Sequence, residues 1–264
     1  MGFGTDILRA RLAALLRRAL RTVTHVVTRD PVAALTFDDG PDPRCTPRLL
    51  EVLERHQARA TFFMVGEAAR KHQDIVECVA RGGHTIGNHT WDHPSLPLLT
   101  GSERRWQLRA CEQAIAPYGQ GLFRPPFGHQ NVKSRFDALL LGFQVVTWNI
   151  VAEDWLDRDA QWMANRVINQ IQPGSVIVFH DSLYVLLEKR YADREPTLEA
   201  VRLILDRLGD RFRFVTIPEL LRHGRPQLQS WYAWGNREYM GRLCEPDGKP
   251  WRYLPRLGRG PIGK

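Results

Sequence analysis

Two adjacent carboxylates, Asp38 and Asp39, directly follow the apolar run VAALTF at Val32–Phe37 and precede Gly40. An apolar run without polar alternation is typical of a strand that is covered on both faces. Two negative charges at the end of such a strand are costly unless hydrogen bonds or a cation compensate them. The pair is therefore either part of a metal site or part of an ordinary strand-end turn built on Asp-Gly.

His89 and His93 are four residues apart in the segment HTWDH. From one helical turn, two imidazoles at this spacing can reach the same ion, and neutral histidine is a preferred ligand of zinc. The spacing alone is a weak motif, because two surface histidines would produce it as well. Together with one aspartate, the two histidines would form a three-ligand site with open positions for water and substrate, which is the pattern of catalytic metal sites.

The segment RPPFG at 124–128 can supply an oxyanion donor and a fixed cation. Its paired prolines fix the backbone, and the glycine that follows frees it again. Such a loop can aim a peptide N–H at a developing oxyanion, and Arg124 can hold a carboxylate in place. The alternative is a rigid turn after a strand.

His180 ends the apolar run SVIVFH and precedes Asp181. A histidine at the end of a strand is well placed for general acid catalysis near neutral pH, although it can equally bond to the backbone. Asp154 and Trp155 follow another apolar stretch. The aspartate could support a protonated His180, and the tryptophan could wall a pocket.

Strand and helix signals alternate from residue 32 onward, which favours a parallel α/β fold, either an open sheet or a barrel. In such folds functional groups gather at the carboxyl ends of the strands. The expected strands are 32–37, 60–65, 84–87, 121–123, 143–148, 175–179 and 212–215. The expected helices begin at 46 and otherwise cover 67–80, 102–116, 132–141, 159–171 and 196–208.

In their order along residues 31–222, these motifs resemble the polysaccharide deacetylases, the NodB-homology group known as carbohydrate esterase family 4. The resemblance implies an α/β fold, a distorted (β/α) barrel that usually has seven strands. The segments that carry it are LTFDDGPDP (35–43), ATFFMVG (60–66), GHTIGNHTWDH (83–93), FRPPFG (123–128), EDW (153–155) and IVFHD (177–181).

The resemblance also implies a role for each site residue. Asp39, His89 and His93 would hold a divalent metal ion, most commonly Zn²⁺, with Co²⁺ or Ni²⁺ as alternatives. Asp38 would be the base that deprotonates metal-activated water, oriented by Arg124. The N–H of Phe127 would stabilise the oxyanion. His180 would be the acid with Asp154 as its charge partner, and Trp155 and Phe179 would be walls of the substrate pocket.

This chain departs from the family pattern at two positions. Phe127 stands where the family often has tyrosine, which matters little because the backbone N–H is the group that acts. Val151 replaces the first aspartate of the family's Asp-x-x-Asp-Trp motif. The metal set is unaffected, but substrate contacts on that side of the groove are expected to differ.

The expected function is a hydrolase acting on carbon–nitrogen bonds other than peptide bonds. It would remove N-acetyl groups from amino sugars in a polysaccharide, an oligosaccharide or a lipid-linked glycan. One alternative is a non-catalytic sugar-binding module on the same barrel, whose mark would be the loss of a ligand, of Asp38 or of His180. Another alternative keeps the chemistry and replaces the glycan with a non-sugar amide.

The chain has 264 residues and a formal net charge of +8, and the positive charge is concentrated at its ends. Residues 1–30 carry six arginines against two aspartates, and residues 223–264 carry eight basic against three acidic side chains. The centre is therefore close to neutral, so the sequence predicts no nucleic-acid partner.

The three regions of the chain differ in composition and in the spacing of their apolar residues. Apolar side chains within 7–27 are spaced helically and arginines lie opposite them, so residues 1–30 are predicted to be a basic amphipathic helix. This helix either packs on the domain or contacts an anionic membrane peripherally. The expected location is cytoplasmic or on the cytoplasmic membrane face, because no signal peptide is evident. Residues 223–264 are expected to be an irregular tail, rich in Trp, Gly and Pro, and the four widely spaced cysteines predict neither disulfides nor a cysteine metal site.

Overall fold

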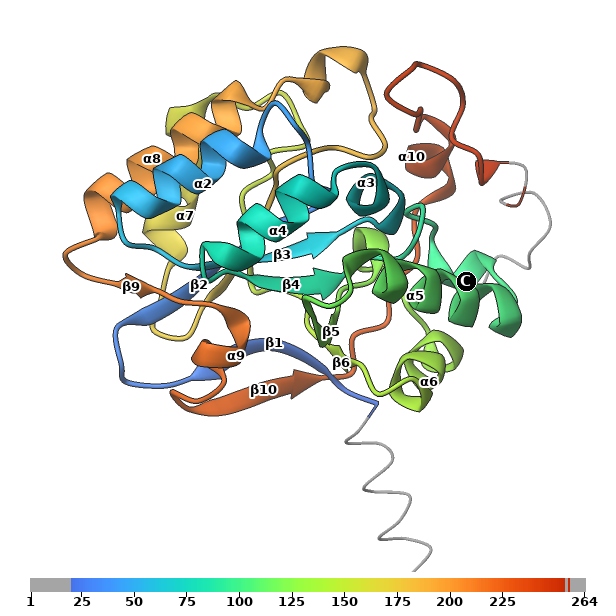
Figure 1. Cartoon of the computed structure of the whole chain (residues 1–264), viewed down its shortest axis with the longest axis horizontal. Coiled ribbons are helices and arrows are strands. Elements are labelled where there is room, and N and C mark those ends of the chain that lie inside the picture. The colour runs from blue at the N-terminus through green and yellow to red at the C-terminus, as the bar shows by residue number, and fades with distance from the viewer. Residues whose placement is uncertain (1–19, 255, 257–264) are drawn as a thin grey trace, which may run out of the picture.

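A curved parallel β-sheet runs through the centre of the molecule, with helices along its outer face (Figure 1). The structure is a computed structural model that describes residues 20–254 and 256. Seven strands follow the order β6-β5-β4-β3-β2-β8-β7, and β9 pairs with β2 beside this path. The expected (β/α) barrel with seven strands is therefore confirmed. The seven strands of this path are β2 (Val32–Asp38), β3 (Ala60–Met64), β4 (Thr85–Asn88), β5 (Gly119–Phe123), β6 (Gln144–Val145), β7 (Ile150–Val151) and β8 (Val176–His180), and the eighth strand of the sheet is β9 (Arg213–Phe214).

The helices largely follow the predicted segments. One exception is the helix predicted over 67–80, which divides at His72 because the backbone there (φ −130°, ψ 56°) leaves the helical region. Another difference is the strand predicted over 143–148, which shortens to β6 and is followed by the unpredicted β7. The helices are α2 (Thr46–Arg55), α3 (Gly66–Lys71), α4 (Gln73–Arg81), α5 (Gly101–Ile115), α6 (Val132–Leu140), α7 (Ala160–Gln170), α8 (Glu195–Leu208), α9 (Ile217–Leu220) and α10 (Arg237–Gly241).

Side chains of the central strands alternate between two environments. Leu35 and Phe37 of β2 point outward and join the core that the sheet forms with α2, α4, α7 and α8. Ala34 points inward and joins a second core inside the curve of the sheet, together with Val176 of β8. Asp38 lies four residues after Ala34, so it shares the inward face.

Residues 22–27 form a strand, which corrects the prediction of a helix continuing to residue 27. This strand, β1 (Thr22–Val27), pairs antiparallel with β10 (Arg225–Gln229). Five of its six residues (TVTHVV) are β-branched, which favours extended backbone, and the partner strand comes from a distant part of the chain. Residues 1–19 of the predicted helix lie outside the described residues.

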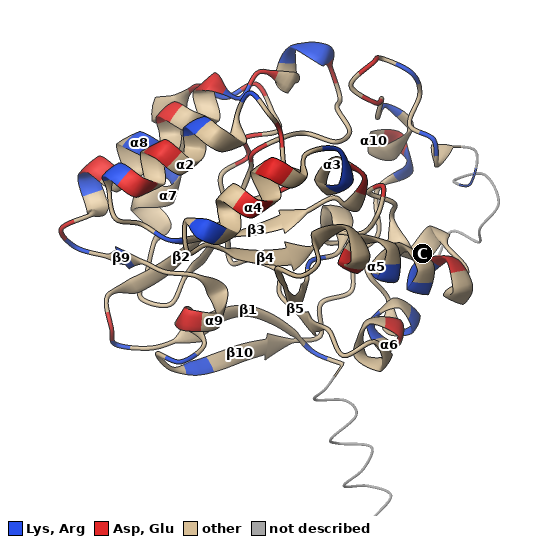
Figure 2. Ribbon diagram, viewed as in Figure 1, with Lys and Arg blue, Asp and Glu red and all other residues tan. Residues whose placement is uncertain are grey.

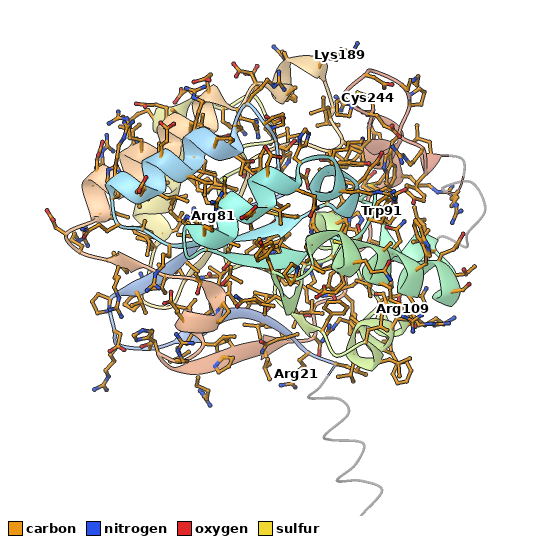
Figure 3. The ribbon with its side chains drawn as sticks, viewed as in Figure 1. Arg21, Arg81, Trp91, Arg109, Lys189 and Cys244 are labelled. Atoms are coloured by element: carbon orange, nitrogen blue, oxygen red, sulfur yellow. The ribbon has the colours of Figure 1, made fainter. Side chains whose placement is uncertain are left out.

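The described part of the segment after residue 223 has more regular structure than the irregular tail that the composition suggested. It contains β10 and α10, and Trp251 within it is 1% exposed. Cys244 lies in the same segment (Figure 3) and bonds in both directions with Leu186 through the backbone. Cys244 forms no disulfide bond, and neither do Cys45, Cys78 and Cys111.

Helices such as α2 and α8 carry charged residues of both signs, as their blue and red segments show, while β3 and β4 carry none (Figure 2). Within the described part of the chain, no helix combines the length and the apolar character needed to cross a bilayer.

Candidate active site

Asp38 and His180 are brought together directly by strand pairing. β2 and β8 run parallel, and their register pairs Asp38 with His180 at the carboxyl ends of both strands. Both side chains line the same cavity. The register of two buried strands therefore places the predicted base and the predicted acid side by side.

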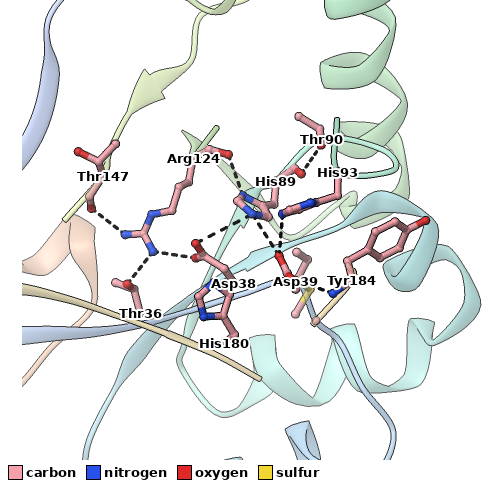
Figure 4. Close-up of polar contacts among 12 residues, drawn as sticks. Thr36, Asp38, Asp39, His89, Thr90, His93, Arg124, Thr147, His180 and Tyr184 are labelled. Carbon is pink, nitrogen blue, oxygen red and sulfur yellow. Dashed lines mark hydrogen bonds and ion pairs between the residues drawn. The ribbon is translucent and has the colours of Figure 1, made fainter. Parts of the chain in front are cut away.

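Asp39 reaches the same cavity because the backbone departs from strand geometry at this residue. Its φ is +77°, a conformation that residues with a side chain rarely adopt. In a regular strand its side chain would point away from that of Asp38. The departure turns both carboxylates toward the histidines (Figure 4).

His89 and His93 lie in a loop after β4, so the predicted helical turn is wrong. Thr90 and His93 both have positive φ values, of 70° and 58°. The loop is fixed by Gln107 of α5, whose side-chain oxygen accepts hydrogen bonds from the backbone N–H groups of Trp91 (2.8 Å) and Asp92 (3.2 Å). The loop still brings the two imidazole rings within 5.1 Å of each other.

Asp39, His89 and His93 converge at one point, with ligand atoms all within 4.8 Å of one another. Oδ1 of Asp39 lies 3.3 Å from Nε2 of His89 and 3.1 Å from Nε2 of His93. Nδ1 of His89 donates a 2.8 Å hydrogen bond to the carbonyl oxygen of Arg124, so a neutral His89 turns the lone pair of Nε2 toward the carboxylate. Two facing lone pairs at this distance repel each other unless a cation lies between them. The residues present therefore fit a divalent metal ion.

The protonation states of the group suit a cation as well. Burial by itself would raise the pKa of Asp39, but the imidazoles of His93 and His89 outweigh this and hold that pKa well below its usual value. Burial lowers the pKa of His93 despite the opposing charge of Asp39. An ionised carboxylate and a neutral imidazole are the forms that bind metal ions.

Arg124 is fully buried and holds Asp38. Nη1 of Arg124 donates 2.7 Å hydrogen bonds to Oδ1 of Asp38 and to the hydroxyl of Thr36. Nη2 donates to the carbonyl of Thr147 (2.8 Å), and the guanidinium lies 4.1 Å from the centre of the Phe63 ring. These contacts hold the guanidinium in place. It therefore fixes the orientation of Oδ1 of Asp38, and the other carboxylate oxygen, Oδ2, faces the cavity.

His180 is held by Asp154. Nδ1 of His180 donates a 2.8 Å hydrogen bond to Asp154, which also accepts from the His180 backbone N–H and from Arg194. Burial would lower the pKa of His180, but the charge and hydrogen bond of Asp154, with the charges of Asp39 and Asp38, raise it to about 9. The ring is therefore protonated at neutral pH, and its second nitrogen is free to donate.

Asp181 was part of a predicted cluster but had no predicted role. Its carboxylate accepts hydrogen bonds from the N–H of Gly40 (3.1 Å) and the hydroxyl of Thr46 (2.5 Å). A Cβ atom on Gly40 would lie 2.2 Å from Oδ2 of Asp181. The absence of a side chain at Gly40 thus lets the turn after Asp39 close against the residue after His180.

Three predicted pocket residues behave differently. Trp155 lines the cavity and packs edge-on against His180 at 5.4 Å, and Phe127 lines it with its ring 4.5 Å from that of His93. Phe179 does not line it: the ring is fully buried and stacks on Phe37, which corrects the prediction of a pocket wall. Since His180 points inward, its neighbour must point outward, and Val178 provides the inward side chain.

Several contributors escaped sequence reasoning because long-range contacts define them. The backbone N–H of Tyr184 donates to Oδ2 of Asp39 (2.9 Å), and the Tyr184 hydroxyl donates to Glu67. Asp92, the neighbour of His93, accepts from Gln107 (2.5 Å) and from Tyr253 (2.6 Å). A carboxylate beside a ligand histidine was the available signal, but its partners lie on other elements.

The cavity above these groups has a volume of about 300 Å³, at the lower end of the range for small-molecule sites. The reactive groups Asp38, Asp39 and His180 lie on one side of it. The remaining lining comes largely from the segment 183–187 after β8 and from α10 and the residue Leu243 that follows.

Fold and site together define a protein of the (β/α) barrel class with an Asp-His-His group at the carboxyl ends of its strands. Comparison with known proteins agrees. The sequence profile described as polysaccharide deacetylase matches residues 25–146. A peptidoglycan-N-acetylglucosamine deacetylase of Bacillus cereus is 36% identical over 191 residues, which cover 71% of this chain and 67% of that protein. A chitooligosaccharide deacetylase of Azorhizobium caulinodans is 32% identical over 185 residues, covering 67% and 88% of the two chains.

A solved structure supports the same assignment at the level of the fold. The crystal structure of a peptidoglycan N-acetylglucosamine deacetylase aligns with a TM-score of 0.72 at 30% sequence identity, covering 82% of this chain and 99% of that one. The chain belongs to the polysaccharide deacetylase family, whose reaction is hydrolytic deacetylation.

Proposed function

We propose that the chain is a zinc-dependent hydrolase that removes the N-acetyl group from an N-acetylated amino sugar of a glycan. The observation that carries this proposal is the facing pair of lone pairs on Asp39 and His89, placed beside Asp38 and His180. The named substrates of the relatives, peptidoglycan and chitooligosaccharide, support a glycan substrate. The presence of both Asp38 and His180 favours an enzyme over a non-catalytic sugar-binding module.

Asp39, His89 and His93 would hold the metal ion. When bound there, a divalent ion acts as a Lewis acid and lowers the pKa of a water molecule to roughly 7. Asp38 supplies the base, because Arg124 holds its Oδ1 and leaves Oδ2 to accept a proton from the attacking water. The water oxygen then adds to the carbonyl carbon of the acetyl group, and the N–H of Phe127 stabilises the resulting oxyanion.

His180 completes the reaction as the acid. Its Nδ1 is bound to Asp154, so Nε2 carries the proton that is transferred to the amide nitrogen. The C–N bond breaks as this proton is transferred, and the products are acetate and a free amine. Without proton donation the leaving group would be an amide anion, which is too basic to depart.

The test is acetate release from N-acetylglucosamine oligomers by the full chain with added zinc. Asp38→Asn is expected to lower kcat by at least ~10²-fold, since general base catalysis contributes about this much or more. Zinc affinity, measured by calorimetry, should stay within about threefold of that of the wild type. Asp210→Asn, at an exposed loop position, serves as the matched control. A near wild-type rate for Asp38→Asn would reject the assigned base, and no release from any acetylated amino sugar by the wild type would reject the function.

We also propose that the arginine-rich segment 1–21, which precedes β1, contacts an anionic membrane surface from the cytoplasmic side. The support is its sequence alone, with apolar and arginine side chains at helical spacing. Co-sedimentation with vesicles of anionic and of zwitterionic lipid tests it, with Arg17→Glu/Arg18→Glu as the variant. Equal sedimentation of the variant and the wild type with anionic vesicles would contradict the proposal.

A further inference from the structure

The cavity beside the reactive groups has a largely apolar lining. Apart from the reactive residues, the described lining supplies only His129, Tyr239 and the indoles of Trp148 and Trp155 as polar side chains. Within the described residues 20–254, the lining of this cavity contains no Asn, Gln, Ser, Thr, Lys, Arg or Glu. Sugar hydroxyls that enter such a cavity would exchange their hydrogen bonds to water for only a few side-chain partners.

His129 adds little to this polar set. Burial lowers its pKa to about 4, so the ring is neutral at physiological pH. Its Nδ1 is already within 3.1 Å of the hydroxyl of Ser95.

Five aliphatic side chains of the lining come from the segments that follow β8 and α10, and together we call them the hydrophobic wall. It combines the segment after β8 with the C-terminal segment, and the two are joined by backbone hydrogen bonds of 2.8 Å in both directions between Leu186 and Cys244. Val185 and Leu243 belong to the same buried cluster. The members of the hydrophobic wall are Leu183, Val185, Leu186, Leu187 and Leu243.

The hydrophobic wall adjoins the reaction centre. Tyr184, in the middle of its first segment, donates its backbone N–H to the Asp39 carboxylate. The ring of Tyr184 lies 6.0 Å from that of His93. A group bound against the wall is therefore attached within a few atoms of the reacting amide.

The size of the cavity decides which side of the amide this group occupies. An acetyl group has two carbons and fills only a small part of about 300 Å³. Since the family reaction is deacetylation, the remaining volume must accommodate what is attached to the nitrogen side of the amide.

We propose that the hydrophobic wall binds a hydrocarbon aglycone, so that the preferred substrate is an amphiphilic N-acetylated amino sugar linked to an alkyl or lipid chain. This inference rests on the proposed function and names the substrate class of the same site. Burial of the aliphatic chain against five aliphatic side chains supplies the binding free energy. The sugar then presents its hydroxyl groups toward the open side of the cavity.

The test compares the methyl and octyl β-glycosides of N-acetylglucosamine, below the micelle concentration of the octyl compound, with the zinc-loaded full chain. Free amine is the product measured. The expected kcat/KM is at least tenfold higher for the octyl compound. Calorimetric binding of both glycosides gives a second readout, in which the octyl compound should bind at least tenfold more tightly.

Leu187→Asn should remove most of this preference, because Leu187 is a partly buried member of the hydrophobic wall. Leu187→Phe narrows the cavity without adding polarity and should also remove it, which covers the case that the asparagine variant does not fold. Leu140→Asn on α6, where the leucine is 61% exposed, is the matched control and should retain the preference.

The outcomes separate the two proposals. Equal turnover and equal binding of the methyl and octyl glycosides would overturn the inference and leave the proposed function intact. A preference for N-hexanoyl over N-acetyl methyl glycoside, without a preference for octyl, would assign the wall to the acyl side and overturn the aglycone assignment. Tight octyl binding without any turnover would reject the proposed function and support the hydrophobic wall.

Discussion

The hydroxyl of Tyr253 donates a 2.6 Å hydrogen bond to the carboxylate of Asp92, across 161 residues of sequence. Asp92 directly precedes the ligand candidate His93, and Gln107 bonds to both partners. Arg252 adds a contact of 3.3 Å to the same carboxylate. The C-terminal segment is therefore a structural support of the site and not an appendage.

Tyr253→Phe should weaken zinc binding about three- to tenfold. This is less than the ~10–100-fold typical when a direct partner of a ligand is lost, because Tyr253 acts through Asp92. The variant should also melt at a lower temperature, since a hydrogen bond to a charged group contributes about 1.5–3 kcal/mol. Competition with a chromophoric chelator measures the affinity. Tyr232→Phe, at a side chain that is 43% exposed, is the control, and identical affinities for wild type and Tyr253→Phe would contradict the supporting role.

Arg124→Met should lower the free energy of unfolding by about 3–5 kcal/mol, because it leaves Asp38 buried without its cation. Arg124 is 0% exposed, so water cannot replace the lost hydrogen bonds. Urea denaturation measures the loss. Arg109→Met on the exposed side of α5 should change stability by less than about 0.5 kcal/mol. Similar midpoints for the two variants would show that the buried ion pair does not contribute.

The catalytic rate should fall as the pH rises through the pKa of His180, because the acid must be protonated. Asp154→Asn removes the interaction that raises this pKa to about 9, so the alkaline limb of kcat should move to lower pH by at least one unit. An unchanged limb would argue against His180 as the acid. The contribution of His180 to folding stability also falls as the pH rises. Its pKa in the folded state lies above the ordinary 6.5, so the stabilisation is full below about pH 6.5 and is lost as the pH rises through 9.

Gly40→Ala should destabilise the protein by at least about 1–3 kcal/mol, the usual cost of overpacking, and should weaken zinc binding. The new Cβ would collide with Asp181 and displace the turn that begins at Asp39. Thermal melting and zinc titration measure the two effects. Gly241→Ala is the matched control, because nothing lies within 4 Å of a Cβ at that position. Wild-type zinc affinity in Gly40→Ala would mean that the turn tolerates a shift.

Much of the site was accessible from the sequence because its residues lie at the ends of apolar runs. A buried parallel strand is an uninterrupted apolar segment, and a polar residue that ends it marks the carboxyl edge of the sheet. Asp38, Asp39, Arg124 and His180 carry this signal. Their meeting at one edge follows from parallel pairing, so the sequence alone predicted their proximity.

The tertiary structure decided what local patterns leave open. Side-chain alternation turns Phe179 outward once His180 faces inward, and the spacing of His89 and His93 fits a loop braced by α5 as well as a helical turn. Residues 22–27 became a strand because β10, some 200 residues later, offers a partner. The contact between Tyr253 and Asp92 and the hydrophobic wall likewise depend on where distant segments pack. Local sequence determines which backbone conformations are low in free energy, whereas strand pairing and burial between remote segments select among them.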